Sequence, residues 1–355
     1  MHKKLFIPGP VDVRPEILEA MGMPMIGHRT KEASALGESI CRKLQKVFYT
    51  DNPVLLSTTS GSGLMEGSVR SLTAKRAVVF SVGAFGNRWA KMAQVNGVPC
   101  DKVEAEWGQP TLPETVDKYL STGKYDVFTI THNETSTGVM NPVEEIAEVR
   151  KKYPDVLWLV DAVSSAVGVK IEVDRLGIDV CITSTQKALA LPPGLAVCTI
   201  SEKALARGRT VENRGLYLDL IAIYDYMQKK PYQYPSTPSL SHYFALDKQL
   251  DYILDVEGLE NRFARHLEMA QITRAWANKH FEQFAAKGYE SVTLTTVKNT
   301  KGISIADLNK RIGEKGYMIS NGYGDLKEKT FRIAHMGDRS VAELQELLAL
   351  LDTEI

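Results

Sequence analysis

The sequence predicts an α/β protein whose central sheet is mostly parallel. Three observations lead to this fold class. Short apolar runs alternate with longer amphipathic segments, which is the rhythm of βαβ units. Several runs are continuous in Val, Ile and Leu, as expected of strands that are covered on both faces. The length of 355 residues allows a large core and favours two domains.

The predicted elements follow one another along the chain in two groups. Strands are expected at residues 54–56, 77–81, 127–131, 157–160, 180–183 and 195–200, with helices at 63–74, 87–95 and 143–152. After about residue 240 a long helical stretch precedes two short strand-like runs, "SVTLTTV" and "TFRIAHMG", and a final helix at 340–351. We therefore expect an N-terminal segment over 1–15, a large α/β domain over 16–245 and a small α+β domain over 246–355.

The composition excludes several classes of protein. Lysine plus arginine equals aspartate plus glutamate at 43 each, so no overall charge favours binding to nucleic acid or to a membrane surface. No apolar run approaches the about 18 residues that a membrane span requires, and the N-terminus does not resemble a signal peptide. Four scattered cysteines without CxxC spacing predict reduced thiols and a cytoplasmic protein.

The segment "STTSGSGLMEG" (57–67) follows the first predicted strand and opens a helix. Free backbone N–H groups and the helix dipole at such a point favour a phosphate group. The spacing is neither a Walker loop nor a GxGxxG fingerprint, so it does not specify a nucleotide. An ordinary serine-capped helix start is the alternative.

Two charged residues stand at the ends of later strands. Asp161 follows five apolar residues, and Lys187 comes after the apolar run that ends near residue 183. Because parallel strands bring their carboxyl ends to one edge of a sheet, both side chains are expected in one cleft. A lysine amine, a carboxylate and a phosphate cradle are the parts that hold pyridoxal phosphate. The alternatives are a helix-capping aspartate and a surface lysine.

Eight short segments, in this order and spacing, resemble those of one enzyme family. They are "PGP" (8–10), "SGSGLMEG" (60–67), "GAFGNRW" (83–89), "THNETSTGV" (131–139), "LVDAVSS" (159–165), "TSTQKALALPPG" (183–194), "YPSTPS" (234–239) and "FRIAHMG" (331–337). Over essentially its full length the chain is similar to the class V, fold type I aminotransferases of the alanine–glyoxylate and serine–pyruvate group. The resemblance implies pyridoxal 5'-phosphate as cofactor and no metal.

The resemblance also assigns roles around the cofactor. Lys187 is expected to form the Schiff base and to move the proton, and Asp161 to hold the pyridine nitrogen protonated. The phosphate cradle is expected to contain no arginine, so that backbone N–H groups do most of the work. The implied cofactor-binding residues are Ser60, Gly61, Ser62, Phe85, Thr135, Asp161, Gln186, Lys187, Tyr234 and Thr237. For Phe85, taken by itself, core packing is the alternative, and His132 is equally well read as a structural histidine.

Other matched residues concern the substrate and the partner subunit. Tyr234 and Thr237 match residues that the family extends across a homodimer interface to the phosphate, so the active sites are expected to be shared. The implied substrate-binding residues are Arg332, for the α-carboxylate, together with Gly9, His28 and Arg29. Phosphoserine aminotransferases carry a similar His-Arg pair, and the alternative for Arg29 is pairing with Glu32 or Glu38.

The predicted function is transamination between a small L-amino acid, serine or alanine, and a 2-oxo acid, glyoxylate or pyruvate. A phosphoserine or aspartate aminotransferase that uses 2-oxoglutarate is the second choice. A lyase or aldolase on the same scaffold stays open, because such enzymes share the cofactor shell. A cysteine desulfurase is disfavoured, since Gln186 stands where those enzymes typically have a histidine and no cysteine occupies a predicted mobile loop.

Overall fold

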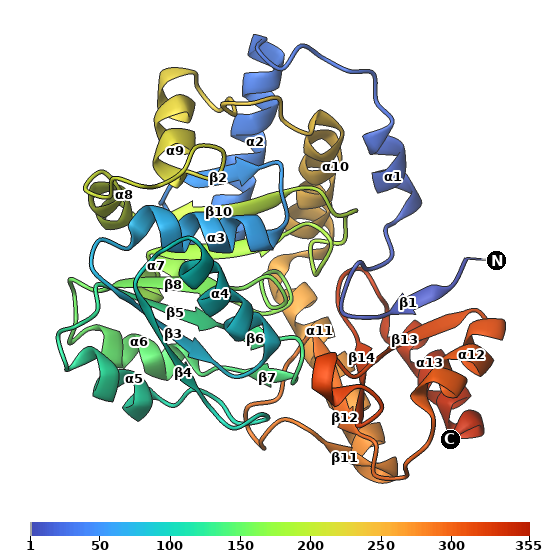
Figure 1. Ribbon diagram of the computed structural model, residues 1–355. Helices are drawn as coiled ribbons and strands as arrows, with labels where there is room; N and C mark the ends of the chain where they lie inside the picture. The colour runs from blue at the N-terminus through green and yellow to red at the C-terminus, as the bar shows by residue number, and fades with distance from the viewer. Residues whose placement is uncertain (1) are drawn as a thin grey trace.

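The computed structural model describes residues 2–355 and has a large and a small layered part (Figure 1). The large part surrounds a seven-stranded sheet with the order β2-β10-β9-β8-β5-β3-β4. All strands run in one direction except β10, which is antiparallel to both of its neighbours. The strands are β2 (Val54–Ser57), β3 (Ala77–Ser81), β4 (Cys100–Glu104), β5 (Val127–Thr131), β8 (Leu157–Asp161), β9 (Val180–Ser184) and β10 (Ala196–Ile200). The predicted mostly parallel sheet is confirmed.

The continuous apolar pattern of the strands reflects burial on both faces. In β8, Trp158 and Val160 pack in one hydrophobic cluster, whereas Leu157 and Leu159 pack in a second cluster on the other face. Helices α2, α5, α6 and α10 contribute to the first cluster, and α3, α4, α8 and α9 to the second. Charged side chains therefore have a place at the ends of these central strands, and that is where the site residues lie.

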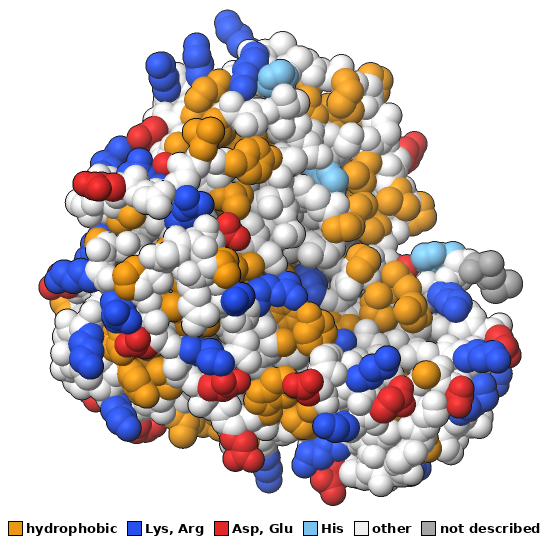
Figure 2. Space-filling view, viewed as in Figure 1, with side chains coloured by type: hydrophobic (Ala, Val, Ile, Leu, Met, Phe, Trp, Pro, Cys, Tyr) orange, Lys and Arg blue, Asp and Glu red, His pale blue; other side chains and the backbone are white. Residues whose placement is uncertain are grey.

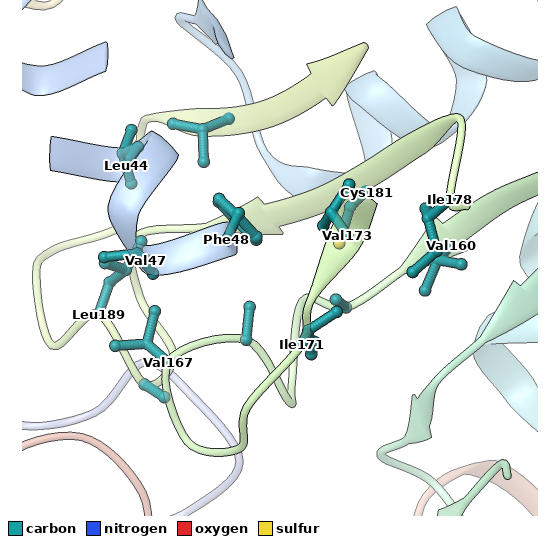
Figure 3. Packing of buried hydrophobic residues seen from close by; sticks show 14 of the residues in the cluster. Leu44, Val47, Phe48, Val160, Val167, Ile171, Val173, Ile178, Cys181 and Leu189 are labelled. Carbon is teal, nitrogen blue, oxygen red and sulfur yellow. The ribbon is translucent and has the colours of Figure 1, made fainter. Parts of the chain in front are cut away.

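The helices of the large part match the predicted ones and add several that were not predicted. They are α1 (Pro15–Met21), α2 (Lys31–Phe48), α3 (Gly61–Leu72), α4 (Ala84–Val95), α5 (Pro113–Leu120), α6 (Val143–Arg150), α7 (Val173–Leu176), α8 (Glu202–Gly208), α9 (Leu220–Lys229) and α10 (Leu240–Asp251). Figure 3 shows Leu44 and Phe48 of α2 in the same buried cluster as Cys181 of β9. Leu189, two residues after Lys187, joins that cluster and anchors the turn that carries the lysine.

One strand of the large sheet was not predicted. The residues of β4, Cys-Asp-Lys-Val-Glu, include three charged residues, and none of the five is fully buried. The strand lies at the sheet edge and pairs with β3 alone. A strand with one neighbour and partial cover does not require a continuous apolar run, so the pattern that identified the central strands was absent here.

The small part is a five-stranded sheet with helices packed on it. Its order is β1-β13-β14-β12-β11, and the sheet is antiparallel except for the β1–β13 pair. The elements are β1 (Lys4–Phe6), a π-helix (Tyr252–Glu257), α11 (Leu259–His280), β11 (Glu282–Gln283), β12 (Leu294–Lys298), α12 (Ile305–Glu314), β13 (Tyr317–Asn321), a 3-10 turn (Gly324–Leu326), β14 (Thr330–Ala334) and α13 (Val341–Glu354). The predicted N-terminal segment thus supplies a strand to the small sheet.

A buried polar network ties the N-terminal segment to both parts. Arg14 donates to Asp338 at 2.8 Å and to Gln249 at 2.7 Å, and Arg262 donates to Asp338 at 2.9 Å. Arg262 and Gln249 are fully buried, so each depends on these partners to offset its desolvation. Among residues 2–355, no helix has the length and apolar character needed to cross a bilayer.

Candidate active site

A cavity of about 240 Å³ lies at the carboxyl ends of β8 and β9, beside the starts of α3 and α4. Its lining brings together residues from five of the segments that the sequence singled out. Eight of the ten predicted cofactor-binding residues line it: Ser60, Gly61, Ser62, Phe85, Thr135, Asp161, Gln186 and Lys187. A short two-stranded hairpin, β6 (Asn133–Glu134) and β7 (Val139–Met140), frames the side that carries Thr135.

Lys187 occupies a tight turn after β9 and is not a surface residue, with only 8% of it exposed. Its amine donates a hydrogen bond to the carbonyl oxygen of Pro8. Burial, and next the positive charge of Arg332, lower the pKa of Lys187 to about 8. Near neutral pH a larger share of such an amine is neutral than of an ordinary lysine, although most of it is still protonated, and the neutral form is the one that attacks a carbonyl carbon.

Asp161 is the last residue of β8 and is 4% exposed. Its carboxylate accepts a hydrogen bond from the backbone N–H of Val163 at 2.9 Å. Asp161 therefore caps the following turn, which was the alternative role considered for it. Burial raises the pKa of Asp161 to about 7. No Lys, Arg or His within the described chain forms an ion pair with it. A protonated ring nitrogen in the cavity would supply the missing positive charge.

The cradle at the start of α3 has space for a phosphate and little else. Ser60 stands at the N-cap position, but its side chain makes no capping hydrogen bond, so the ordinary serine cap is not observed. A Cβ atom on Gly61 would lie 2.5 Å from Cγ2 of Val163, so a larger residue would close the cradle. The side-chain oxygens of Ser184 and Gln186, which also line the cavity, are buried without a partner in the described residues. These features fit a polar ligand with a phosphate group.

Phe85 is held in place by a residue that the sequence did not identify. The backbone N–H groups of Phe85 and Gly86, in the first turn of α4, donate to the carboxylate of Glu134 at 3.0 and 3.1 Å. Glu134 is fully buried, and burial raises the pKa of its carboxyl group. Thr135 lies 2.6 Å from Ser164, measured between their hydroxyl oxygens. The only signal in the sequence was an acid just after a predicted buried strand in "THNETSTGV", and it did not identify the partner on α4.

His132 lies outside this cavity. Its ring is buried, and burial lowers its pKa to about 4, so the imidazole is neutral. Its backbone N–H donates to the carbonyl oxygen of Asp161 at 2.8 Å. The burial fits a structural histidine, but Nδ1 of the ring has no hydrogen-bond partner among the described residues, so the expected satisfied histidine is not observed.

The expectation that no arginine stands at the cradle is wrong. Arg88, from α4, lines the cavity, and its Nη1 atom lies 3.4 Å from the hydroxyl of Ser62. Its guanidinium carbon is 4.8 Å from the ring centroid of Phe85. Because residues three apart on a helix share one face, Phe85 and Arg88 point to the same side. That spacing in "GAFGNRW" was the signal that could have identified it.

Arg332 reaches the site from β14 of the small sheet and is 8% exposed. Its guanidinium donates to the carbonyl oxygens of Thr135 at 3.2 Å and Asn321 at 3.1 and 3.2 Å. Burial lowers its pKa to about 10, so it stays charged at neutral pH. Within residues 2–355 it has no carboxylate partner. Such a cation can accept a substrate carboxylate.

Gly9 packs against the side chain of Lys187. Its φ angle is +94°, and a Cβ atom there would lie 2.8 Å from Cδ and 3.0 Å from Cε of Lys187. The close approach makes glycine a requirement at this position. In the structure, Gly9 therefore positions the lysine, and its predicted contact with substrate stays a prediction.

The four remaining predicted residues lie away from the cavity of their own chain. Arg29 donates to the carbonyl oxygen of Tyr234 at 2.6 Å, and it forms no ion pair with Glu32 or Glu38 in the described residues. Its neighbour His28 is partly exposed. The Tyr234 side chain is buried, with its hydroxyl 3.3 Å from that of Ser57, whereas Thr237 is exposed. Their contacts with a cofactor or substrate stay predictions.

Comparison with known proteins identifies relatives across the whole chain. The family model described as Aminotransferase class-V matches residues 18–325. An uncharacterized aminotransferase of Methanocaldococcus jannaschii is 41% identical over 99% of this chain and 92% of its own length. The serine–glyoxylate aminotransferase of Arabidopsis thaliana is 32% identical over 99% of this chain and 89% of its own length.

A solved structure shows the same fold. The alanine–glyoxylate aminotransferase of Nostoc sp. superposes with a TM-score of 0.93 at 28% identity, covering 99% of this chain and 95% of the other. Three findings point to the same family. They are the fold, the lysine and carboxylate at the strand ends, and the family match over most of the sequence. The chain belongs to the class V aminotransferases, a family of pyridoxal phosphate-dependent transferases.

Proposed function

We propose that this enzyme transfers an amino group from a small L-amino acid, serine or alanine, to glyoxylate or pyruvate. The observation that carries the proposal is the single cavity in which Lys187, Asp161 and the cradle of Ser60–Ser62 converge, with Arg332 at its side. These residues match the needs of pyridoxal phosphate in charge, in hydrogen-bonding capacity and in available space. When bound, that cofactor supplies an electron-withdrawing ring that stabilises the negative charge left when a Cα proton is removed.

Each protein group has one task in the proposed reaction. Arg332 binds the α-carboxylate of the amino acid and so fixes the direction of its Cα–H bond. The Nζ atom of Lys187 takes the Cα proton as general base and later returns a proton as general acid. A pKa of about 8 suits both tasks near neutral pH. The negative charge of Asp161 keeps a proton on the ring nitrogen, and the N–H groups at the start of α3 hold the phosphate.

The choice of a small donor is supported by two findings. Two of the three proteins named above are a serine–glyoxylate and an alanine–glyoxylate aminotransferase. Arg29 was considered as the residue that binds an anionic substrate group. Its guanidinium instead donates hydrogen bonds to carbonyl oxygens of residues 234–236. Desulfurase chemistry has no support among the described residues, because none of the four cysteines lines the cavity and burial raises the pKa of the Cys41 and Cys198 thiols to about 12. The cytoplasmic location stays a prediction.

We further propose a homodimer with shared active sites. Large apolar side chains are exposed at Met23, Met25, Leu216 and Tyr217. Arg29 joins the segment after the two methionines to the 234–237 loop, and the Tyr217 ring lies 6.3 Å from that of Tyr234. Hydrophobic side chains also gather over the upper helices in Figure 2. A second copy of the chain would cover such a surface and bring the exposed Thr237 towards the partner's cradle.

The substrates are tested by a donor–acceptor activity matrix on purified, cofactor-loaded protein. We expect serine or alanine with glyoxylate or pyruvate to give the highest kcat/KM. Racemisation and retro-aldol cleavage, assayed side by side, should be slower than transamination. Dominant cleavage or racemisation would contradict the proposal and favour the lyase or aldolase alternative.

The shared site is tested by mixing two impaired variants. Lys187→Ala and Thr237→Ala each damage one part of the proposed composite site. A mixed dimer would contain one intact site, so activity should rise after subunit exchange. Absence of recovery, in samples shown by mass to contain mixed dimers, would argue against a contribution of Thr237 to the partner.

A further inference from the structure

Two arginine side chains, Arg88 in the lining of the cavity and Arg332 beside it, have no acidic partner in residues 2–355. Arg332 comes from the small sheet and Arg88 from α4 of the large part. The donors of Arg88 meet only hydroxyl groups, those of Ser62 at 3.4 Å and Tyr323 at 2.9 Å. A guanidinium group at a cavity is best satisfied by a carboxylate or phosphate, which accepts two parallel hydrogen bonds. The proposed serine or alanine substrate carries one carboxylate, and Arg332 can accept it. Such a substrate has no second carboxylate for Arg88 to bind.

A single tyrosine separates the two cations. The Tyr323 hydroxyl accepts from Arg88, and the Arg332 guanidinium carbon lies 5.6 Å from the Tyr323 ring centroid. The same ring lies 5.6 Å from the ring of Phe85, inclined by 39°. Figure 2 shows Lys and Arg side chains gathered at the centre of the face, between the two parts of the molecule. The two positive groups thus lie on either side of one tyrosine side chain, each in contact with it.

The Tyr323 hydroxyl adds a second donor at this point. Because it accepts a hydrogen bond from Arg88, its own proton is free to be donated elsewhere. Arg88 and Tyr323 together therefore present N–H and O–H donors to a common position. Neutral side chains such as those of alanine would leave these donors without an anion.

We propose that Arg88, with the Tyr323 hydroxyl, binds the side-chain carboxylate of a dicarboxylic amino acid or oxo acid while Arg332 holds the α-carboxylate. The proposal rests on the proposed transaminase function and extends its substrate range to aspartate, glutamate and their oxo acids. It locates the second anion site within one chain, and not at Arg29. Since Tyr323 belongs to the small part and Arg88 to the large part, a bound dicarboxylate would also bridge the two.

The test compares donors in the holoenzyme and in Arg88→Gln. The measured quantity is the ratio of kcat/KM for aspartate or glutamate to that for alanine, with glyoxylate as acceptor. We expect this ratio to fall by about thirtyfold or more in Arg88→Gln, as when one partner of a desolvated charge pair is removed. Tyr323→Phe, which keeps the ring and removes the hydroxyl, should lower the ratio by about threefold to tenfold.

Two further measurements separate this role from cofactor binding. Arg70→Gln is the matched control, because Arg70 lies on α3 and contacts asparagines outside the cavity; it should leave the ratio unchanged. Calorimetric titration of the holoenzyme with succinate, compared with propionate, should show a preference for succinate that Arg88→Gln abolishes. Because Arg88 also lies 3.4 Å from Ser62 of the cradle, the affinity of the apoprotein for pyridoxal phosphate is measured as well, and in Arg88→Gln it should fall by a smaller factor than the dicarboxylate ratio.

The contrary outcomes are distinct. A similar loss for all donors with weaker cofactor binding would make Arg88 a phosphate anchor and overturn the proposal. Wild-type protein that turns over alanine or serine but neither dicarboxylic donor, and binds no succinate, would also overturn it. Absence of transamination with every donor would instead refute the proposed function itself.

Discussion

Gly9→Ala is expected to damage the site through its contact with Lys187. At a φ of +94° an alanine is strained, which costs about 1–2 kcal/mol for a left-handed backbone. Its Cβ would also stand 2.8 Å from Cδ of Lys187 and 3.0 Å from the Gln186 carbonyl oxygen. Overpacking of this kind costs a further about 1–3 kcal/mol. The free energy of unfolding should therefore fall by about 2–5 kcal/mol.

The matched control is Gly288→Ala. Gly288 has a φ of +89°, and a Cβ there would have no neighbour within 4 Å. It should lose only the backbone component, about 1–2 kcal/mol. Urea denaturation of the two apoprotein variants gives both values.

The decisive assay is cofactor attachment. Displacement of Lys187 should slow the appearance of visible absorbance after pyridoxal phosphate is added to the Gly9→Ala apoprotein, by about tenfold for each 1.4 kcal/mol that the clash raises the barrier. Gly288→Ala should attach cofactor at the wild-type rate. If the two variants matched each other in stability and in attachment, the argument that Gly9 positions the lysine would be refuted.

Three further predictions concern the catalytic groups. Lys187→Ala should abolish transamination and the visible absorbance of the bound cofactor while circular dichroism stays unchanged; full activity would sink the assignment. Asp161→Asn should lower kcat severely, by about a hundredfold or more, with cofactor still bound, because a neutral amide cannot hold a proton on the ring nitrogen; a mild loss would mean that Asp161 is only a cap. The rate of cofactor attachment to the apoprotein should rise with pH through a midpoint of about 8, since the lowered pKa of Lys187 makes the amine neutral above that pH; a midpoint near the ordinary lysine value of about 10.4 would contradict the effect of burial.

The sequence predicted the centre of the fold well because burial leaves a strong pattern. Strands covered on both faces are dominated by apolar residues, so β5 and β8 were recognisable from a few residues each. Lys187 and Asp161 were predicted in the same way, because each is a charged residue next to a buried apolar run, where only a ligand or a charged partner offsets its desolvation. Edge strand β4 and three-residue β1 carry no such pattern, and their pairing depends on neighbours far along the chain.

The site residues that were not predicted contact segments far away in the sequence. Glu134 positions Phe85 by accepting from the backbone of α4, and nothing in either segment alone specifies that partnership. The spacing of Phe85 and Arg88 indicates that they share one helix face, but it places Arg88 at the site only when α4 is known to lie beside the cradle. Arg29 was considered for an anionic ligand, but its guanidinium finds carbonyl oxygens of a loop two hundred positions away. Long-range contacts of this kind become visible only in three dimensions.

The pairing of β1 with β13 has a consequence for biosynthesis. β1 leaves the ribosome long before β13 is made, so the small sheet cannot close until most of the chain has been translated. The residues just after β1 include Pro8 and Gly9, which contact Lys187. During elongation the lysine therefore lacks the neighbours that hold its amine, even after β8 and β9 have formed. Cofactor capture is thereby coupled to the end of translation, and a nascent chain stalled before β13 should bind pyridoxal phosphate poorly.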